Sequence, residues 1–334
     1  MTVAEHDGGL RLRVLMEPRH GARYEEILAL ALATERAGFD AFFRSDHLFG
    51  VDPEDPDYLP TDSWTTLGGL ARDTERVRLG TLMTAATFRS PGLLAAIVAS
   101  VDEMSGGRVE LGIGTGWYER EHTAFGLPFP PMKERFDRLE EQLEIVTGLW
   151  LAGSGLAGSG LTGSAGSGFS FDGRHYRIED NRTPPRVIQR PHPPIIVGGG
   201  GPRRTPAIAA RFATEFNAAL SSVDDARARF AGFARACEAI GRDPAGARLS
   251  GFIPVAIGSS QAEAERRAAI VASPRIRESM LIGPPGLLAD RVADLAGVGA
   301  DTVYLHIFDI HDLDHIALIG AEVLPQLDAV SRAS

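Results

Sequence analysis

The sequence predicts a (β/α)8 barrel of the TIM type with insertions at the C-terminal mouth. Strand-like and helix-like segments alternate along its 334 residues, and alternating βα units imply a parallel sheet. Eight strand segments are recognisable, the number that closes such a barrel, whose typical size of about 250 residues leaves room for insertions. A doubly wound open sheet is the alternative. The strand count and the absence of a dinucleotide-binding fingerprint favour the barrel.

The first four βα units follow from hydrophobic periodicity. Alternating apolar residues predict strands, and apolar residues three and four positions apart predict helices. Gly38 ends the first helix, Asp62 or Ser63 caps the second, and Pro91 stands in the first turn of the third. The expected strands are 10–16, 39–44, 77–81 and 109–113, and the expected helices are 22–37, 61–72, 91–104 and 133–150.

The same pattern resumes after an interruption. The expected strands are 194–197, 215–217, 248–257 and 302–307, and the expected helices are 205–212, 224–240, 261–271, 286–295 and 313–330. Residues 1–9 are predicted to be a flexible N-terminus, and residues 10–330 a single barrel domain.

The interruption is a Gly/Ser-rich insertion at 152–168, followed by a segment at 169–178 that resembles a small hairpin. Such a composition is flexible and cannot bury much surface. A mobile insertion without chemistry is the favoured interpretation. A lid or substrate loop is the alternative, because long loops often serve as lids.

Composition excludes several function classes. The formal net charge of -10 argues against general nucleic-acid binding, which needs a positive surface. Cys237 is the only cysteine, so intramolecular disulfides and cysteine zinc clusters are excluded. No apolar run is long enough for a membrane helix, and the N-terminus does not have the pattern of a secretory signal. A cytoplasmic protein without membrane or nucleic-acid partners is expected.

Candidate site residues follow the strands, because the chemistry of a barrel lies where its strands end at the C-terminal face. Asp46 and His47 follow the second strand. The pair could orient an imidazole for proton transfer or bind a planar ligand, and a capped turn with a structural histidine is equally compatible. Thr115, Gly116 and Trp117 follow the fourth strand. Glycine there permits close approach of a ligand, on which Trp117 could stack, and a plain tight turn is the alternative.

Two further strand ends carry candidate residues. A run of four glycines and then Arg203 precede a helix, which favours phosphate binding over a plain turn because backbone N–H groups and the helix dipole attract anions. His306 ends the last strand and is expected near the mouth. No metal site is expected, since the acidic and histidine residues after it lack a metal-ligand spacing. The glycines of the run are Gly198, Gly199, Gly200 and Gly201.

Five blocks together resemble the bacterial luciferase-like flavin superfamily, and within it the branch of oxidoreductases that use the deazaflavin coenzyme F420. The resemblance covers about residues 10–325. The blocks are SDHLF, ERVRLGTLMTAATFRSP, SGGRVELGIGTGWYEREHTAFGLPFPP, ERFDRLEEQLEIVTGLW and RPHPPIIVGGGGPRRT.

The resemblance implies a usually dimeric barrel with the flavin ring at its C-terminal mouth. It implies that Asp46 and His47 lie beside the ring. The loop of Leu82, Met83 and Thr84 should hold a bulge, often with a non-proline cis peptide bond, behind the ring. Thr115 and Gly116 match ring-lining positions, and the glycine run at 198–201 matches the phosphate turn.

One departure from the family pattern concerns the substrate. The sugar-phosphate dehydrogenases carry an acid directly after the Thr-Gly pair, where this sequence has Trp117. Sugar-phosphate chemistry is therefore not expected. An apolar mouth implies a mostly apolar small-molecule substrate, with Phe49, Trp117 and His306 as pocket residues. Met83, Phe88 and Phe125 add to the apolar set.

The expected function is hydride transfer between F420 and a C=C, C=N or C=O bond. His47 is the expected proton donor or ring anchor, Asp46 would set its tautomer, and His306 is the weaker candidate. An FMN-dependent monooxygenase that uses oxygen is the alternative. A barrel that binds a ligand without turnover is a third hypothesis.

Overall fold

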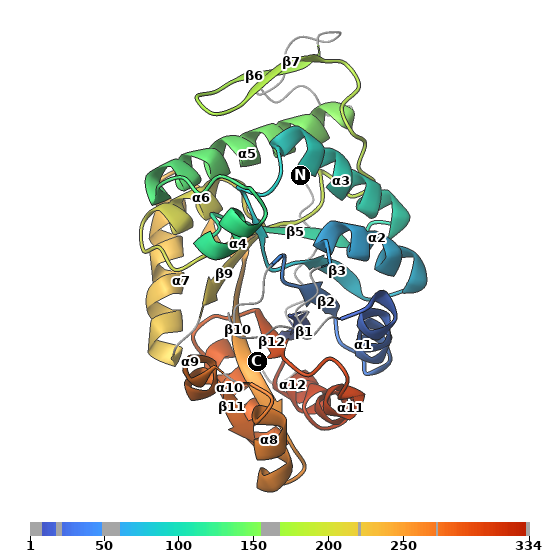
Figure 1. Cartoon of the computed structure of the whole chain (residues 1–334). Coiled ribbons are helices and arrows are strands. Elements are labelled where there is room, and N and C mark those ends of the chain that lie inside the picture. The colour runs from blue at the N-terminus through green and yellow to red at the C-terminus, as the bar shows by residue number, and fades with distance from the viewer. Residues whose placement is uncertain are drawn as a thin grey trace.

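The computed structural model describes residues 9–17, 22–48, 61–154, 168–219, 222–271 and 273–331. Within these residues, eight parallel strands form a closed ring in which β12 returns to β1 and β10 pairs with β9 (Figure 1). The predicted barrel is therefore confirmed. In order around the ring, the strands are β1 (Arg11–Met16), β2 (Ala41–Arg44), β3 (Arg78–Thr81), β5 (Val109–Gly114), β8 (Ile195–Gly198), β9 (Glu215–Ala219), β10 (Arg248–Ile257) and β12 (Thr302–Ile307).

Helices cover the outside of the ring (Figure 1). The Asp62 side chain accepts a hydrogen bond from the backbone N of Thr65, as expected of a helix cap. The helix expected at 313–330 is divided at Val323, because Pro325 cannot donate a helical backbone bond. The outer helices are α1 (Tyr24–Arg36), α2 (Ser63–Asp73), α3 (Pro91–Met104), α5 (Met132–Gly153), α6 (Arg204–Phe212), α7 (Val223–Glu238), α10 (Pro285–Ala296), α11 (Leu313–Glu322) and α12 (Leu324–Ser331).

Short elements follow three of the strands at the mouth. They are β4 (Thr84–Ala85) after β3, α4 (Glu119–Ala124) after β5, and the group α8 (Gln261–Ala268), α9 (Pro274–Ser279) and β11 (Leu281–Gly283) after β10. β11 extends the sheet beside the end of β10. A 3-10 turn, η1 (Pro244–Gly246), precedes β10.

The Gly/Ser-rich segment begins where α5 ends. Arg135, in the first turn of α5, contacts Gly116 at the mouth, so Gly153 lies roughly 30 Å away at the opposite end of the helix. Residues 155–167 of this segment are outside the described part of the chain. The hairpin expected after it is present as β6 (Phe169–Asp172) and β7 (Arg177–Asn181). It lies along the outer side of α5 (Figure 1), where Glu141 accepts three backbone N–H bonds from residues 174–176.

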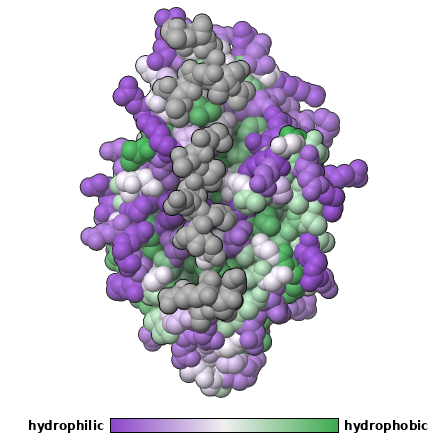
Figure 2. All heavy atoms as spheres, turned by 180° about the vertical axis from the view of Figure 1, so that it is seen from behind, coloured by the Kyte–Doolittle hydropathy of each residue, from purple (hydrophilic) through white to green (hydrophobic). Residues whose placement is uncertain are grey.

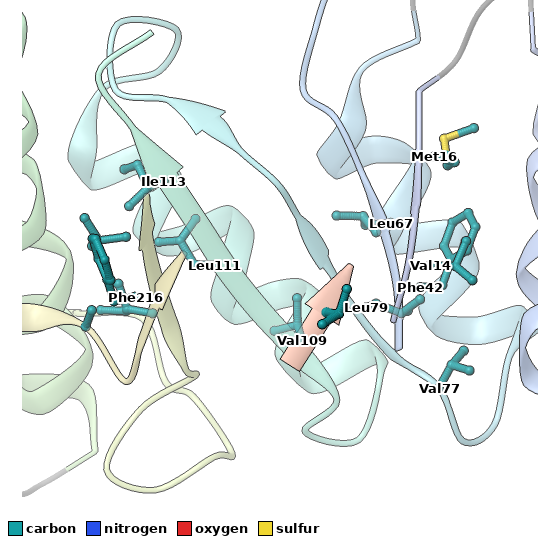
Figure 3. Close-up of a cluster of buried hydrophobic side chains, with 14 of the residues drawn as sticks. Val14, Met16, Phe42, Leu67, Val77, Leu79, Val109, Leu111, Ile113 and Phe216 are labelled. Atoms are coloured by element: carbon teal, nitrogen blue, oxygen red, sulfur yellow. The ribbon is translucent and has the colours of Figure 1, made fainter. Parts of the chain in front are cut away.

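The main hydrophobic core lies between the ring and its helices. Val14 and Met16 of β1 point outward and pack with Phe42 and Leu67 (Figure 3). Apolar residues recur at every second strand position on this outward face, as a half-buried strand requires. Burial of this surface is the largest favourable contribution to folding.

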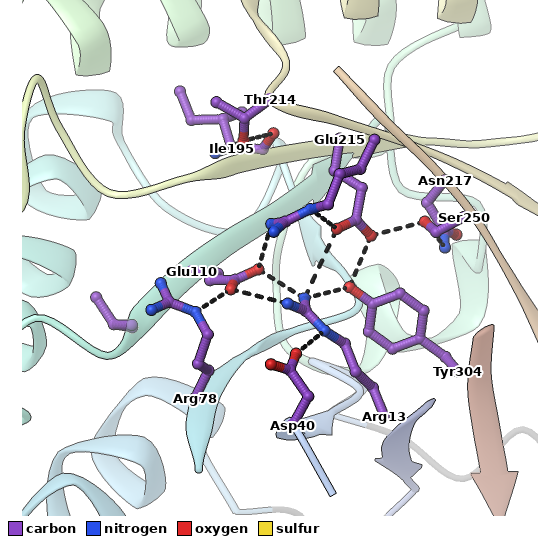
Figure 4. A network of polar contacts seen from close by, with 12 residues as sticks. Arg13, Asp40, Arg78, Glu110, Ile195, Thr214, Glu215, Asn217, Ser250 and Tyr304 are labelled. Atoms are coloured by element: carbon purple, nitrogen blue, oxygen red, sulfur yellow. Dashed lines mark hydrogen bonds and ion pairs between the residues drawn. The ribbon is translucent and has the colours of Figure 1, made fainter. Parts of the chain in front are cut away.

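The side chains inside the ring form three layers. The lowest is a charged network in which Arg13 contacts Asp40, Glu110 and Glu215 (Figure 4). Arg78 bonds with Glu110 and Arg248 with Glu215, so three arginines meet three carboxylates. The middle layer is mainly apolar and consists of Leu15, Ala41, Phe43, Leu82, Ile196 and Tyr304. The Tyr304 hydroxyl reaches the network below, where it accepts a bond from Arg13 and donates one to Glu215. The top layer opens to the mouth and includes Glu17 and His306.

The surface is mainly polar at its sides. Seen from the face opposite to Figure 1, hydrophilic residues predominate along both sides of the molecule, and apolar residues appear between them (Figure 2). In the part of the chain that the structure describes, no helix is both long and apolar enough to cross a membrane.

Candidate active site at the barrel mouth

The mouth has two chemically different halves. The ends of β5 and β8 carry the buried glycines Gly112, Gly114 and Gly198, and we call this side the glycine half. The ends of β1, β2 and β12 carry Glu17, His47 and His306, and we call this side the titratable half. The first half consists of closely packed glycine backbone, whereas the second carries side chains that can hold protons.

Met83 fills the floor of the glycine half. A Cβ atom on Gly198 would lie 2.5 Å from Cε of Met83 and 2.8 Å from the backbone O of Asn217. A Cβ atom on Gly112 would lie 1.9 Å from the backbone O of Thr81. Only glycine fits at these two positions. The peptide bond between Leu82 and Met83 is cis, as the family resemblance implied.

Thr84 is the member of this loop whose side chain faces away from the mouth. Its Oγ1 accepts a bond from Nε1 of Trp64 at 3.0 Å and donates to Oγ1 of Thr81 at 3.1 Å. The side chain is fully buried. Contact between Thr84 and a cofactor would therefore involve its backbone, and the sequence prediction did not make this distinction.

An aromatic cluster of Trp117 and Tyr118 lies beside His47 at the mouth. Trp117 is 60% exposed and stacks on Tyr118, with ring centroids 5.2 Å apart. The edge of His47 meets the Trp117 ring at 5.6 Å between centroids. The structure thus brings together Trp117 and His47, which the sequence analysis had placed after different strands. Phe49, the third predicted pocket residue, lies outside the described residues.

His47 is held by a carboxylate from α4. Its Nδ1 lies 3.0 Å from Oε2 of Glu121, which also accepts the backbone N–H of Leu48 at 3.1 Å. Glu121 is buried. Burial alone would lower the pKa of His47, but the hydrogen bond and charge of Glu121, with the charges of Glu17 and Asp46, raise it above 6.5. The imidazole therefore keeps its proton to a higher pH than a free histidine.

Asp46 does not orient the His47 ring, which is the role that the sequence analysis expected for it. Its carboxylate accepts bonds from Arg89 at 2.6 Å and from Oγ of Ser63 at 2.6 Å. It is buried and ties β2 to α2 rather than orienting the His47 ring. Glu121 occupies the orienting position instead. Adjacent side chains on an extended chain point to opposite sides, which explains the correction.

Arg135 is a further site residue, which the sequence analysis did not single out. Its side chain is buried, with 6% exposed, and Nη1 donates to the backbone O of Gly116 at 2.8 Å. Within the described chain its Nε has no hydrogen-bond partner and no carboxylate forms an ion pair with it. Burial lowers the pKa of its guanidinium, and Glu119 only partly opposes this. A buried cation in this state is suited to an anionic ligand.

The glycine run leads into the N-terminus of α6. Gly199 has a φ of +146°, and Arg203 is the exposed residue that caps α6. Gly201 lies against Oγ1 of Thr205 and the ring of Phe136, the neighbour of Arg135 in α5. Arg204 is already engaged by Asp137 and Glu140. The glycine run and the start of α6 therefore lie against the first turns of α5.

The remaining pair lies on the floor of the titratable half. Nε2 of His306 is 3.3 Å from Oε2 of Glu17, and both side chains are largely buried. The rings of Phe252 and Phe308 flank the His306 imidazole. His306 is therefore near the mouth, as predicted, and Glu17 is a partner that the sequence analysis did not identify. Among the described residues, no group of three or more potential ligands could hold a metal ion.

Known proteins share this architecture and parts of the sequence. An F420-dependent glucose-6-phosphate dehydrogenase of Microbacterium testaceum is 36% identical over 184 residues, covering 54% of this chain and 48% of that protein. The chain thus spans about half the length of that relative. An FMNH2-dependent dimethylsulfone monooxygenase of Pseudomonas putida is 27% identical and covers 91% of this chain and 89% of its own length.

Solved structures confirm the fold. The coenzyme F420-dependent tetrahydromethanopterin reductase of Methanopyrus kandleri superposes with a TM-score of 0.76 at 19% identity, over 96% of this chain and 99% of its own. The family model described as luciferase-like monooxygenase matches residues 9–276, which is most of the barrel. This chain therefore belongs to the luciferase-like monooxygenase family.

Proposed function

We propose that this protein is an oxidoreductase that transfers a hydride between coenzyme F420 and a small, mostly apolar organic substrate, reducing a C=C, C=N or C=O bond. The observation that carries this proposal is that the mouth consists of a glycine half and a titratable half. A glycine half with a buried arginine faces a half that carries the proton-holding pair of His47 and Glu121. The F420-dependent enzymes among the relatives support this choice of cofactor.

The residues of the glycine half fit a planar ring attached to a phosphate. Gly114 and Gly198 pack against Met83, so no side chain projects from these two strand ends into the path of a ring. Arg135 supplies a buried positive charge whose Nε has no hydrogen-bond partner among the described residues. The glycine run and the N-terminus of α6 supply backbone N–H groups for the phosphate, and Arg203 adds charge at the rim.

Bound F420 would supply the hydride, and this chain supplies position and a proton. Glu121 fixes the His47 ring through Nδ1, so the proton passed to the substrate is the one on Nε2. Because Glu121 is buried and also bonds the backbone N–H of Leu48, the imidazole keeps one orientation. Such positioning provides much of the rate in hydride-transfer enzymes.

The aromatic residues beside His47 indicate the kind of substrate. Trp117 and Tyr118 present aromatic faces to the mouth, and Trp117 is widely exposed. A mostly apolar molecule would bury these faces on binding. The position of Trp117 is the one that carries an acid in the sugar-phosphate dehydrogenases, so the proposal excludes sugar phosphates.

The FMN-dependent monooxygenase remains the second candidate function. The FMNH2-dependent relative from Pseudomonas putida covers nearly the whole chain, whereas the F420-dependent relative from Microbacterium testaceum covers about half of it. FMN also carries a phosphate that Arg135 could bind. This alternative predicts preference for FMN and consumption of oxygen.

The family resemblance also supports three expectations about the whole protein. We propose that it is a homodimer, that it acts in the cytoplasm, and that the barrel is one domain interrupted by the Gly/Ser-rich insertion. Sedimentation analysis of the purified protein tests the first of these, with a mass near twice 35.7 kDa expected.

A fluorescence titration of the purified protein with F420 and with FMN tests the cofactor assignment. F420 is expected to bind at least tenfold more tightly than FMN. Arg135→Gln is expected to weaken F420 binding by roughly ten- to a hundredfold, because a charge-assisted contact to phosphate is worth about 1.5–3 kcal/mol. Arg204→Gln is the matched control, since Asp137 and Glu140 already neutralise that side chain.

Each outcome of the titration decides between the candidates. Preference for FMN would reject the F420 proposal in favour of the monooxygenase. Binding of neither cofactor would reject both functions. Equal losses in Arg135→Gln and Arg204→Gln would remove Arg135 from the phosphate site.

A further inference from the structure

One short loop, residues 87–89 between β4 and α3, bonds to the sequence neighbours of both members of the pair formed by His47 and Glu121. The first neighbour is Asp46, which directly precedes His47. Arg89 of the loop donates to the buried carboxylate of Asp46 at 2.6 Å. Adjacent side chains on an extended chain point to opposite sides. The contact with Asp46 therefore fixes the backbone from which the His47 side chain projects toward the mouth.

The second neighbour is His122, which directly follows Glu121 in α4 and is fully buried. Its Nδ1 lies 2.7 Å from the backbone O of Tyr118, and its Nε2 lies 2.7 Å from Oγ1 of Thr87 in the loop. A carbonyl oxygen only accepts hydrogen bonds, so Nδ1 carries a proton and Nε2 can accept the hydroxyl of Thr87. The ring of Phe88, the next residue of the loop, packs 5.1 Å from the imidazole.

Helix geometry explains why the place of His122 matters for Glu121. Successive residues of an α-helix are rotated by about 100°, so Glu121 faces His47 while His122 faces the loop. The helix α4 has only six residues, and its N-cap residue, Tyr118, makes no side-chain cap bond. So short a helix depends on tertiary contacts to keep its place, and the bond to Thr87 is one of them.

The loop is itself fixed to the scaffold. The fully buried Gln142 of α5 donates from its side-chain amide to the backbone O of Arg89 at 2.9 Å. The guanidinium of Arg89 also bonds with Asp62, the cap of α2. Directly before the loop, β4 pairs with β5 of the ring. A segment held by two helices and a strand can keep two other segments in a constant relation to each other.

We propose that residues 87–89 align His47 with Glu121, and that Thr87 and Arg89 are positioning residues for this pair. They act through the sequence neighbours of the pair, one on each side. The proposal rests on the proposed function for the role of this alignment in proton transfer. The alignment itself is a property of the protein without cofactor.

Thr87→Val tests this alignment, because valine has the shape of threonine without the hydroxyl and changes no charge. A shift in the pKa of His47 in this variant therefore reports a change in geometry. Burial lowers the pKa of His47, and the hydrogen bond and charge of Glu121 lead the contacts that raise it. Histidine titrations by NMR on the protein without cofactor should show that pKa lowered by roughly half a unit or more.

Three further variants serve as references for this result. Glu121→Gln removes the charge itself and should lower the pKa of His47 by more than Thr87→Val does. Thr87→Ser retains the hydroxyl and should keep the pKa of the parent protein. Thr34→Val is the matched control, because it removes a buried hydroxyl that bonds the backbone O of Leu30 within α1. It should leave the pKa of His47 unchanged.

An unchanged pKa of His47 in a folded Thr87→Val protein would overturn the proposal, as would an equal shift in Thr34→Val. If Thr87→Val does not fold, His122→Asn takes its place, because the shorter amide loses the contact with Thr87. The same lowering is expected there, and an unchanged pKa of His47 would again overturn the proposal.

Nitrogen NMR of the parent protein gives an independent readout. His122 should carry its proton on Nδ1, and a ring with its proton on Nε2 alone would contradict the bond from Thr87 and overturn the proposal. Because none of these measurements needs a cofactor, their failure is distinct from failure of the F420 titration.

Discussion

At the scale of single residues, His315 shows how burial sets the protonation state. It lies in the first turn of α11 and is 3% exposed. Its Nε2 accepts the backbone N–H of Ile257, the last residue of β10. Burial, and then the charge of Arg267, lower the pKa of His315 to about 4. The ring is therefore neutral at physiological pH, and its bond to β10 depends on that neutrality.

We expect this residue to make stability depend on pH. The folded-state pKa lies below the unfolded value of about 6.5, so the unfolded chain binds more protons between these limits. Stability is fully present above about pH 6.5 and falls as the pH drops toward 4, by at most about 1.4 kcal/mol per pH unit. Urea unfolding at pH 7, 6 and 5 measures this loss.

The control for this prediction is His315→Gln, which retains an acceptor for Ile257. Its free energy of unfolding should decline less between pH 7 and 5 than that of the parent protein. His311→Gln should behave as the parent does, because His311 is exposed. Parallel pH profiles for all three proteins would contradict the assignment to His315.

The site residues illustrate what sequence patterns can and cannot supply. His47 was predicted because it follows a strand at the catalytic face of a barrel. Its partner Glu121 was not, because Glu121 comes from α4 and meets His47 only after the ring has closed. In the sequence, nothing distinguishes Arg135 from the other charged residues of its helix. Its burial, with Nε left without a hydrogen-bond partner among the described residues, is a tertiary property.

At the scale of elements, long periodic segments were predicted well and short ones were not. The expected strand at 302–307 coincides with β12, and the expected helix at 91–104 with α3. The elements α4, α9 and β11 were missed, since three to six residues carry too little periodicity. These short elements follow strands at the mouth, where tertiary contacts override local preference.

The close packing of β3 against β5 yields a prediction at this scale. Gly112→Ala would place a Cβ atom 1.9 Å from the backbone O of Thr81, and a backbone atom in a closed ring cannot move aside cheaply. We expect a loss of at least about 2 kcal/mol in the free energy of unfolding.

The matched control for this change is Gly286→Ala in α10. A Cβ atom there meets nothing within 4 Å, and alanine favours the helix by up to about 1 kcal/mol. Thermal unfolding of both variants provides the comparison. Equal melting temperatures for the two variants would show that β3 and β5 pack less tightly than the structure indicates.

At the scale of the whole molecule, the charged network ties the bottom of the ring together. Arg13 on β1 contacts Glu110 on β5 and Glu215 on β9, across the width of the barrel (Figure 4). Burial alone would raise the pKa of Glu110, but the charges of Arg13, Arg78 and Arg248 lower it well below its ordinary value. Strands distant in sequence are therefore coupled through one set of charges.

Removing one charge from this network should be costly. Arg13→Met leaves buried carboxylates without a full partner, and we expect a loss of about 3–5 kcal/mol in the free energy of unfolding. Arg177→Met breaks an exposed pair with Glu179 and should cost under about 1 kcal/mol. Chemical unfolding of the two variants distinguishes them, and similar losses would mean that the network contributes no more than a surface pair.

The apolar layer between this network and the mouth has a consequence for how such a protein can change over time. Leu15 and Phe43 lie between the charges that hold the ring closed and the groups that meet a ligand. Residues more than about 7–10 Å apart without shared partners contribute additively to stability. Mutations at the mouth can therefore accumulate in a lineage without reducing the stability that the charged network gives to the ring. A barrel partitioned in this way can acquire new substrates by drift while its folding remains under separate selection.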